Sequence, residues 1–261
     1  VHLIEKLPVD LVGTVEAAGM IAVPADTGRF SVAWLVTDDG GPLADKRVRQ
    51  AFNYALNTDA IIAAVYQGYA SPIASPFTKS TLGYDASIEP YPYDPDRARE
   101  LLAEAGYPDG FSVTLDTTGD PTEGLLTASA LEEIGIQVTV RQLEASIFNT
   151  NWTTGEMSEI YAASWGAAGD PQQYLDMLVK SDGFLSRYAH ERVDELLAQS
   201  AVTLATDARA ALLSEIQQIL HDDPASIYQW STADIYGVAP TVQNWRPHST
   251  ERLIVSGVSL Q

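Results

Sequence analysis

Extended and helical segments alternate along most of this chain. The stretch 29–36, RFSVAWLV, is typical of a buried strand, and the turn signal TDDGGP follows it. The next stretch, 43–56, has the spacing of an amphipathic helix. Its apolar residues share one helical face: Val48, Ala51, Phe52 and Ala55. Because alternating helices and strands bury their apolar faces on one another, the sequence predicts an α/β fold.

The stretch 94–106, DPDRARELLAEAG, carries the start and stop signals of a helix. Asp94 can accept hydrogen bonds from the free N–H groups of the first turn, and Pro95 suits that turn. Gly106 can take the left-handed conformation that ends a helix. The expected apolar stripe consists of Ala98, Leu101, Leu102 and Ala105.

The rest of the chain continues this alternation. Strands are expected at 111–117, 136–143 and 159–165, and helices at 125–134, 145–152, 172–179, 191–202 and 207–221, the third of them capped by Asp170. The Pro-rich stretch 67–93 is interpreted as an extended connecting loop. Near the C-terminus, 225–240 predicts a hairpin or an extended segment, and 252–261 alternates apolar and polar residues as an edge strand would.

The balance of charges limits the partners of this chain. Its 35 acidic and 15 basic residues give a net charge of −20, which repels nucleic acid and anionic membrane surfaces. A length of 261 residues, 46% of them hydrophobic, suffices for one large domain, or for a domain with an attached piece of another. The sequence has no apolar run long enough for a membrane span, and the N-terminal VHLIEKLPVD lacks the features of a signal peptide.

Motifs that carry catalysis or bind a cofactor are absent from the sequence. It contains no G-x-S-x-G, G-x-G-x-x-G, G-x-x-x-x-G-K or H-E-x-x-H, and zero cysteines exclude disulfides, thiolate catalysis and Cys-ligated zinc. The four histidines lack the spacing of metal ligands: His2, His190, His221 and His248. We therefore expect no enzymatic activity, no cofactor and no metal, and a monomer that binds no nucleic acid.

The stretch 161–175, YAASWGAAGDPQQYL, joins a large aromatic residue to very small ones. Trp165 ends an expected strand and is followed by Gly166, Ala167, Ala168 and Gly169. One interpretation places Trp165 in the core and makes the small residues a tight turn, and the residues alone favour it. The other makes Trp165 a wall of a ligand pocket, beside which the backbone of 166–169 is accessible for hydrogen bonds.

Four segments in a fixed order carry a resemblance to a known family. They are GPLADKRVRQAFNYALNTDAIIAAVYQGYASP, YPYDPDRARELLAEAGYPDGFSVTL, LEEIGIQVTVRQLE and SWGAAGDPQQYL. From about residue 42 to residue 261, the chain resembles the second half of family 5 extracellular solute-binding proteins. Members are usually about twice as long. The resemblance implies the C-terminal lobe of a type II periplasmic-binding-protein fold, with a mixed sheet flanked by helices.

The resemblance also implies how the chain is divided and what it does. Residues 40–230 would form the ligand-binding lobe, while 1–39 and 231–261 would be hinge strands and a remnant of the N-terminal lobe. The expected function is that of the solute-binding component of an ABC importer, which passes a peptide, opine, sugar or metal chelate to a membrane permease. The expected location is extracytoplasmic, as a periplasmic protein or a cell-surface lipoprotein. The alternatives are a nickel-chelate or cation binder of this family and a partner-binding domain outside transport.

The site implied by the resemblance lies around Trp165. In the family, an aromatic residue at this position often forms one wall of the ligand pocket, which favours the pocket interpretation of Trp165 and of the backbone of 166–169. Phe148 and Asn149, on the preceding helix, are expected as neighbours, because family members often use this region at the cleft.

Three positions depart from the family pattern. Peptide-binding members commonly carry an aspartate that pairs with the ligand's amino group where this chain has Ala168 or Gly169, so ordinary peptides are less expected. Nickel-binding members have an aromatic residue at the position of Gly169, and no suitably placed histidine is found here. Val36 stands where the family more often has asparagine.

Overall fold

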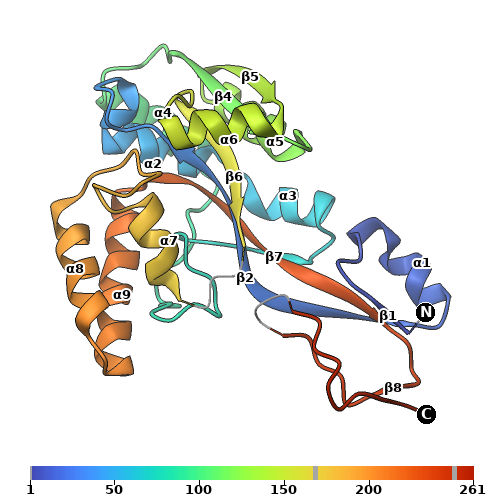
Figure 1. Cartoon of the computed structure of the whole chain (residues 1–261). Helices are drawn as coiled ribbons and strands as arrows, with labels where there is room; N and C mark the ends of the chain where they lie inside the picture. The colour runs from blue at the N-terminus through green and yellow to red at the C-terminus, as the bar shows by residue number, and fades with distance from the viewer. Residues whose placement is uncertain (1, 167–169, 249–251) are drawn as a thin grey trace.

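A mixed sheet forms the centre of the protein. The computed structural model describes residues 2–166, 170–248 and 252–261. The strand order is β1-β7-β2-β6-β4-β5, with β3 paired to β7 (Figure 1). The strands are β1 (Leu3–Ile4), β2 (Ile21–Leu35), β3 (Ala70–Pro72), β4 (Ser112–Thr118), β5 (Gln137–Leu143), β6 (Ile160–Trp165) and β7 (Ser226–Val238). Because β4 pairs in parallel with β5 and β6 while β2 pairs antiparallel with β6 and β7, the predicted α/β class with a mixed sheet is confirmed.

Helices cover both faces of this sheet. One face carries α2 (Lys46–Ala55), α3 (Thr58–Val65), α4 (Pro95–Glu104) and α5 (Thr122–Glu133). The other carries α7 (Pro171–Leu178), α8 (Glu191–Val202) and α9 (Thr206–Asp222), together with Phe148 of α6 (Ala145–Thr154). Successive side chains of a strand point to opposite faces, so β2 supplies both cores. Phe30, Val32 and Trp34 enter the core around α7–α9, and Ala33 and Leu35 enter the core around α2–α5.

β2 and β7 form a long antiparallel ribbon. Their pairing runs from Ile21 opposite Val238 to Trp34 opposite Ser226, with an irregular register between Asp26 and Phe30. The outer part of the ribbon extends away from the helical body (Figure 1). It carries β1, α1 (Val12–Ala17) and the small sheet of β8 (Val242–Gln243) and β9 (Ser259–Leu260), and both ends of the chain lie there. The ribbon therefore joins the helical body to the segments near both termini.

The capping residues expected from the sequence are confirmed. The Asp94 carboxylate accepts a hydrogen bond from the Arg97 N–H at 2.9 Å, and Asp170 accepts one from the Gln172 N–H at 3.0 Å. Gly106 follows α4 with a φ of +96°. These local signals were readable because each depends on residues that are adjacent in the chain.

Other expectations differ from the structure, mainly near the C-terminus. The strand predicted at 29–36 begins at Ile21. Of the two alternatives for 225–240, the extended segment is confirmed and the hairpin is wrong, because the stretch contains the single long strand β7. The edge strand predicted at 252–261 is confirmed only for Ser259 and Leu260, which pair with β8, while the segment before them is exposed and forms no strand. Alternation of apolar and polar residues stabilises a strand where one face is buried, and this segment buries neither face.

Two glycines bring β4 and β5 together. Gly110 precedes β4 and Gly135 precedes β5, with φ values of +71° and +96°. A Cβ atom at Gly110 would lie 1.9 Å from the carbonyl oxygen of Gly135. Beside this contact, the Phe111 carbonyl accepts the Gln137 N–H at 2.8 Å, which sets the start of the parallel pair.

Replacing Gly110 with alanine is expected to destabilise the fold by about 3 kcal/mol or more, because the side chain adds an overlap with backbone to the cost of a left-handed conformation. Gly106→Ala is the matched control, since a Cβ atom there meets nothing within 4 Å. That variant should lose about 1–2 kcal/mol, the backbone cost alone. Urea denaturation of both variants measures the difference, and equal losses would contradict the proposed contact.

Candidate ligand-binding site

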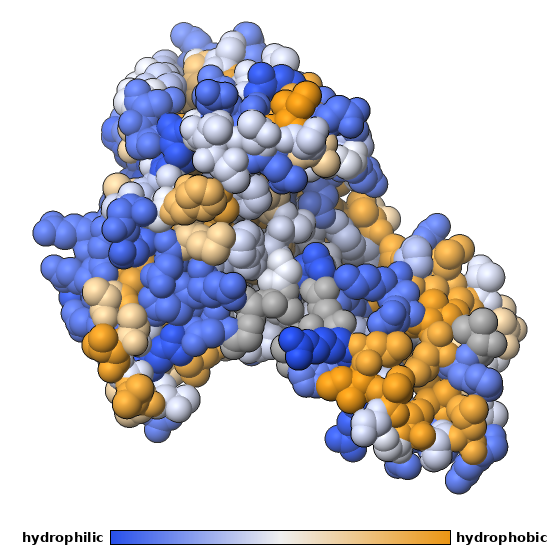
Figure 2. Space-filling model, viewed as in Figure 1, coloured by the Kyte–Doolittle hydropathy of each residue, from blue (hydrophilic) through white to orange (hydrophobic). Residues whose placement is uncertain are grey.

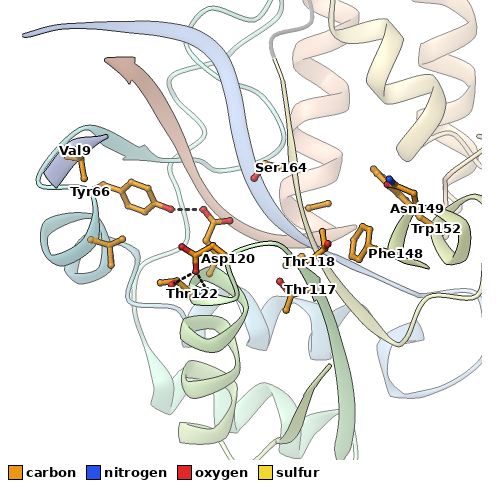
Figure 3. Close-up of a pocket in the computed structure, with 14 residues that line it drawn as sticks. Val9, Tyr66, Thr117, Thr118, Asp120, Thr122, Phe148, Asn149, Trp152 and Ser164 are labelled. Carbon is orange, nitrogen blue, oxygen red and sulfur yellow. Dashed lines mark hydrogen bonds between the residues drawn. The ribbon is translucent and has the colours of Figure 1, made fainter. Parts of the chain in front are cut away.

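A cavity of about 590 Å³ opens where β4 and β6 end beside α5 and α6 (Figure 3). Its walls come from β4, β6, the start of α5, one side of α6, the end of α3 and the segment near the N-terminus. The lining residues are Val9, Val65, Tyr66, Thr117, Thr118, Asp120, Thr122, Glu123, Phe148, Asn149, Trp152, Ala162, Ala163 and Ser164. Figure 3 shows Tyr66 and Asp120 on one side, Phe148, Asn149 and Trp152 on the other, and Thr117 and Thr118 between them.

Phe148 and Trp152 form the aromatic end of the cavity. Both lie on α6, and their rings meet edge to face at a centroid distance of 6.1 Å. Phe148 is only 3% exposed and belongs to the core around α7–α9, whereas Asn149 beside it is exposed. The aromatic end is therefore a rigid apolar surface with one amide at its edge.

Asp120 and Glu123 form the acidic end of the cavity, at the start of α5. The Glu123 carboxylate accepts hydrogen bonds from Tyr66 Oη at 2.5 Å, Ser31 Oγ at 3.3 Å and Trp230 Nε1 at 3.3 Å. These three neutral donors come from the residue after α3, from β2 and from β7. Burial, followed by the charge of Glu123, raises the pKa of Tyr66, so this hydroxyl remains a donor.

The Asp120 carboxylate is exposed and held by the first turn of α5. It accepts hydrogen bonds from the Thr122 hydroxyl at 2.6 Å and the Thr122 N–H at 3.0 Å. The hydroxyl bond, followed by the N–H bond, lowers the pKa of Asp120 below its ordinary value. Asp120 is therefore ionised at neutral pH.

Among the residues predicted for the site, Phe148 and Asn149 line this cavity. Trp165 ends β6 half-buried and lies next to the cavity, not among the described residues that line it. Its ring meets Trp152 edge-on at 6.4 Å. Trp165 thus packs against Trp152 at the aromatic end.

The small residues after Trp165 are described in part. Gly166 follows β6 directly and is half-buried, while Ala167, Ala168 and Gly169 lie outside the described residues. Val36, which departs from the family pattern, is buried in the core around α7–α9.

Sequence reasoning missed the acidic end because it placed the start of this helix too late. The helix predicted at 125–134 begins at Thr122, which puts Glu123 on its first turn and Asp120 just before its N-cap residue, Pro121. A signal was present, since Asp120-Pro121 repeats the Asp-Pro pattern of Asp94-Pro95. Tyr66 and Thr117 had no comparable signal, because long-range packing alone brings them here.

An ion pair fixes the chain just after the stretch 166–169. The Asp170 carboxylate receives two hydrogen bonds from the Arg209 guanidinium, both at 2.7 Å, while it also caps α7. The Arg209 hydrogen bonds are the main cause of a pKa for Asp170 below its ordinary value. Arg209 lies on α9, so the pair ties the beginning of α7 to another helix.

Asp170→Asn is expected to make stability less dependent on pH. A carboxyl whose folded-state pKa is lowered contributes stability above its unfolded pKa of about 3.9, and loses it as pH falls through the folded pKa. The variant keeps an N-cap acceptor and should be less stable by up to about 1 kcal/mol at pH 7. Thermal unfolding between pH 7 and 3 should show this difference shrinking below about pH 4. A constant difference would contradict the assignment.

Within residues 2–166, 170–248 and 252–261, no group of three or more His, Cys, Asp or Glu side chains is placed to hold a metal ion. None of the helices in the described part of the chain has the length and apolarity needed to cross a bilayer.

The fold is that of the type II periplasmic binding proteins. The chain superposes on the periplasmic binding protein DppA from Helicobacter pylori, solved in complex with the peptide STSA, with a TM-score of 0.84 and 26% sequence identity. The match covers 100% of this chain and 52% of that one.

Sequence comparison defines the family. Residues 1–186 match the bacterial extracellular solute-binding proteins, family 5 Middle, so the chain belongs to this family. Its members are transport receptors, not enzymes, and they are periplasmic or extracellular.

Two curated relatives illustrate the range of the family. The glutathione-binding protein GsiB of Pectobacterium atrosepticum is 32% identical over 237 residues, which are 80% of this chain and 43% of that protein. The heme-binding protein A of Haemophilus influenzae is 28% identical over 229 residues, 83% of this chain and 42% of that protein. The chain therefore spans less than half the length of these relatives.

Proposed function

We propose that this chain is the C-terminal lobe of the solute-binding component of an ABC importer. In this proposal, residues 40–230 form the ligand-binding lobe, and 1–39 and 231–261 are hinge strands and a remnant of the other lobe. The full-length protein captures a small extracellular solute and delivers it to a membrane permease. Family membership supports the class of function, and the match to about half of each relative supports the assignment to a lobe.

The observation that carries this proposal is the position of the cavity. It lies at one edge of the helical body, and Val9, from the segment near the N-terminus, contributes to its lining (Figure 3). A volume of about 590 Å³ falls in the range of small-molecule sites. A second lobe attached through the ribbon would close over this opening.

The outer end of the molecule is suited to contact with the rest of the protein. Figure 2 shows apolar residues gathered there, at the lower right of the view. The exposed apolar side chains of the terminal segments are Leu11, Ile21, Leu253, Ile254, Val255 and Leu260. An apolar surface of this kind is typical of a face that is covered in the complete molecule.

Filling the cavity should block solute binding without unfolding the protein. Asn149→Trp places a large side chain at the aromatic end from an exposed position, so stability should change by about 0.5 kcal/mol or less. In the full-length protein, a panel of peptides, opines, sugars and metal chelates is screened by thermal shift. The solute that raises the melting temperature of the wild type should no longer do so in this variant.

Thr150→Trp is the control, because Thr150 is the next residue of α6, is exposed and does not line the cavity. It should retain the solute-induced shift. Equal responses of the two variants would place the binding site elsewhere.

Trp165 is proposed to contact the ligand together with the backbone that follows it. Trp165→Ala in the full-length protein is then expected to weaken binding by about 1–3 kcal/mol, through lost contact area and stacking, and to lower stability by less. Calorimetry and thermal unfolding measure the two effects. Unchanged affinity with a large loss of stability would mean that Trp165 serves the core.

A further inference from the structure

The acidic end of the cavity carries negative charge that the protein does not neutralise. No Lys, Arg or His is found among the described residues that line the cavity. The three donors to Glu123 are neutral, and both donor groups at Asp120 belong to Thr122. Two carboxylates therefore share one cavity without a cation from its walls.

Another carboxylate close to the cavity, on β4, has a cationic partner. Asp116 of β4 is fully buried, and it is paired with Arg141 by hydrogen bonds of 2.6 Å to Nε and 2.8 Å to Nη2. A buried charge ordinarily needs such a partner. Glu123, close by in the fold, is half-buried and has only neutral donors, so a cation beside it would have to come from outside the described protein.

Two threonine hydroxyls in the same cavity also lack a partner from the protein. Thr117 is 3% exposed and lines the cavity between its two ends (Figure 3), and no hydrogen bond joins its hydroxyl to the described residues. The Thr117 hydroxyl lies against the first turn of α5, because a Cβ atom at Gly124 would be 3.5 Å from Thr117 Oγ1. Beside it, Thr118 Oγ1 is buried and has no hydrogen-bond partner among the described residues. Buried polar groups rarely remain unpaired, so this part of the cavity is suited to a ligand.

The start of α5 accounts for part of this arrangement. A helix N-terminus stabilises negative charge, and Asp120 already binds the Thr122 N–H. That effect does not explain the Thr117 hydroxyl, nor the position of Glu123 inside the cavity. The aromatic end supplies a complementary apolar surface, so the whole cavity fits a solute with one cationic and one apolar part.

We infer that the acidic end of this cavity binds a cationic group of the solute, a protonated amine or a guanidinium, through Asp120 and Glu123 with the Thr117 hydroxyl beside them. This inference rests on the proposed function and specifies its ligand class. Glu123 is also held by Tyr66, Ser31 and Trp230, so it is the fixed member of the pair and Asp120 the accessible one.

The test uses pairs of probes that differ in charge and little else. Blocked tripeptides carrying lysine are compared with norleucine, and those carrying arginine with citrulline, while trialanine is compared with its N-acetylated form. A blocked tripeptide carrying glutamate serves as the anionic probe. Binding to the full-length protein is measured by thermal shift and calorimetry, and at least one cationic member should bind about tenfold or more tightly than its neutral partner.

Asp120→Asn should reduce that preference by about tenfold, and Thr117→Val should weaken the cationic probe by a smaller factor. Asp207→Asn is the matched control, since Asp207 is an exposed carboxylate in the first turn of α9, away from the cavity. It should leave the preference unchanged, and any effect it shares with Asp120→Asn would reflect net charge alone.

Three outcomes would overturn the inference: no cationic probe binds, neutral or anionic members bind as tightly as cationic ones, or the preference survives Asp120→Asn. The proposed function is judged separately. If a neutral or anionic solute binds and Asn149→Trp abolishes that binding, the cavity is the binding site and the charge assignment alone is wrong. If no solute of any class in the panel binds, the proposed function is contradicted as well.

Discussion

The pairing of β2 with β7 is the interaction on which the rest of the structure depends. These two strands lie in the middle of the sheet, and β1, β3 and β6 are added to them. Alternate side chains of β2 enter the two cores, so the ribbon gives each group of helices a surface to pack on. Its outer part carries the segments near both termini, and the cavity lies at the boundary between these regions (Figure 1).

The cavity depends on a single carboxylate for much of its shape. Glu123 joins α5 to three other parts of the fold, through the hydroxyls of Ser31 and Tyr66 and the indole of Trp230. Hydrogen bonds to a charged acceptor are stronger than neutral ones, so this arrangement holds four segments together beside the cavity. The same residue thus has a structural role and supplies charge to the cavity.

Local signals in the sequence predicted much of the fold. The features that were not predicted depend on pairing between segments far apart in the sequence. Asp94, Gly106 and Asp170 act within one helical turn, and their roles were read correctly. The length of β2 and the conformation of 252–261 depend on which strand lies alongside. Residues adjacent in the sequence do not indicate that pairing. Of the cavity, Phe148 and Asn149 were anticipated through the family resemblance. The contributions of Tyr66 and Thr117 come from packing between distant segments, which a single sequence does not encode in any short pattern.

The position of β2 and β7 at opposite ends of the chain has a consequence for the order of folding. Ile21 is paired with Val238, so the central ribbon closes a loop that includes most of the described residues. Loop closure on this scale must precede the contacts that reward it, and folds rich in such contacts form slowly. A nascent chain can form the β4-α5-β5 unit from neighbouring residues, but the sheet stays incomplete until β7 has been synthesised. Until then the apolar faces of both cores stay uncovered, and exposed apolar surface of this kind makes a folding intermediate prone to aggregation.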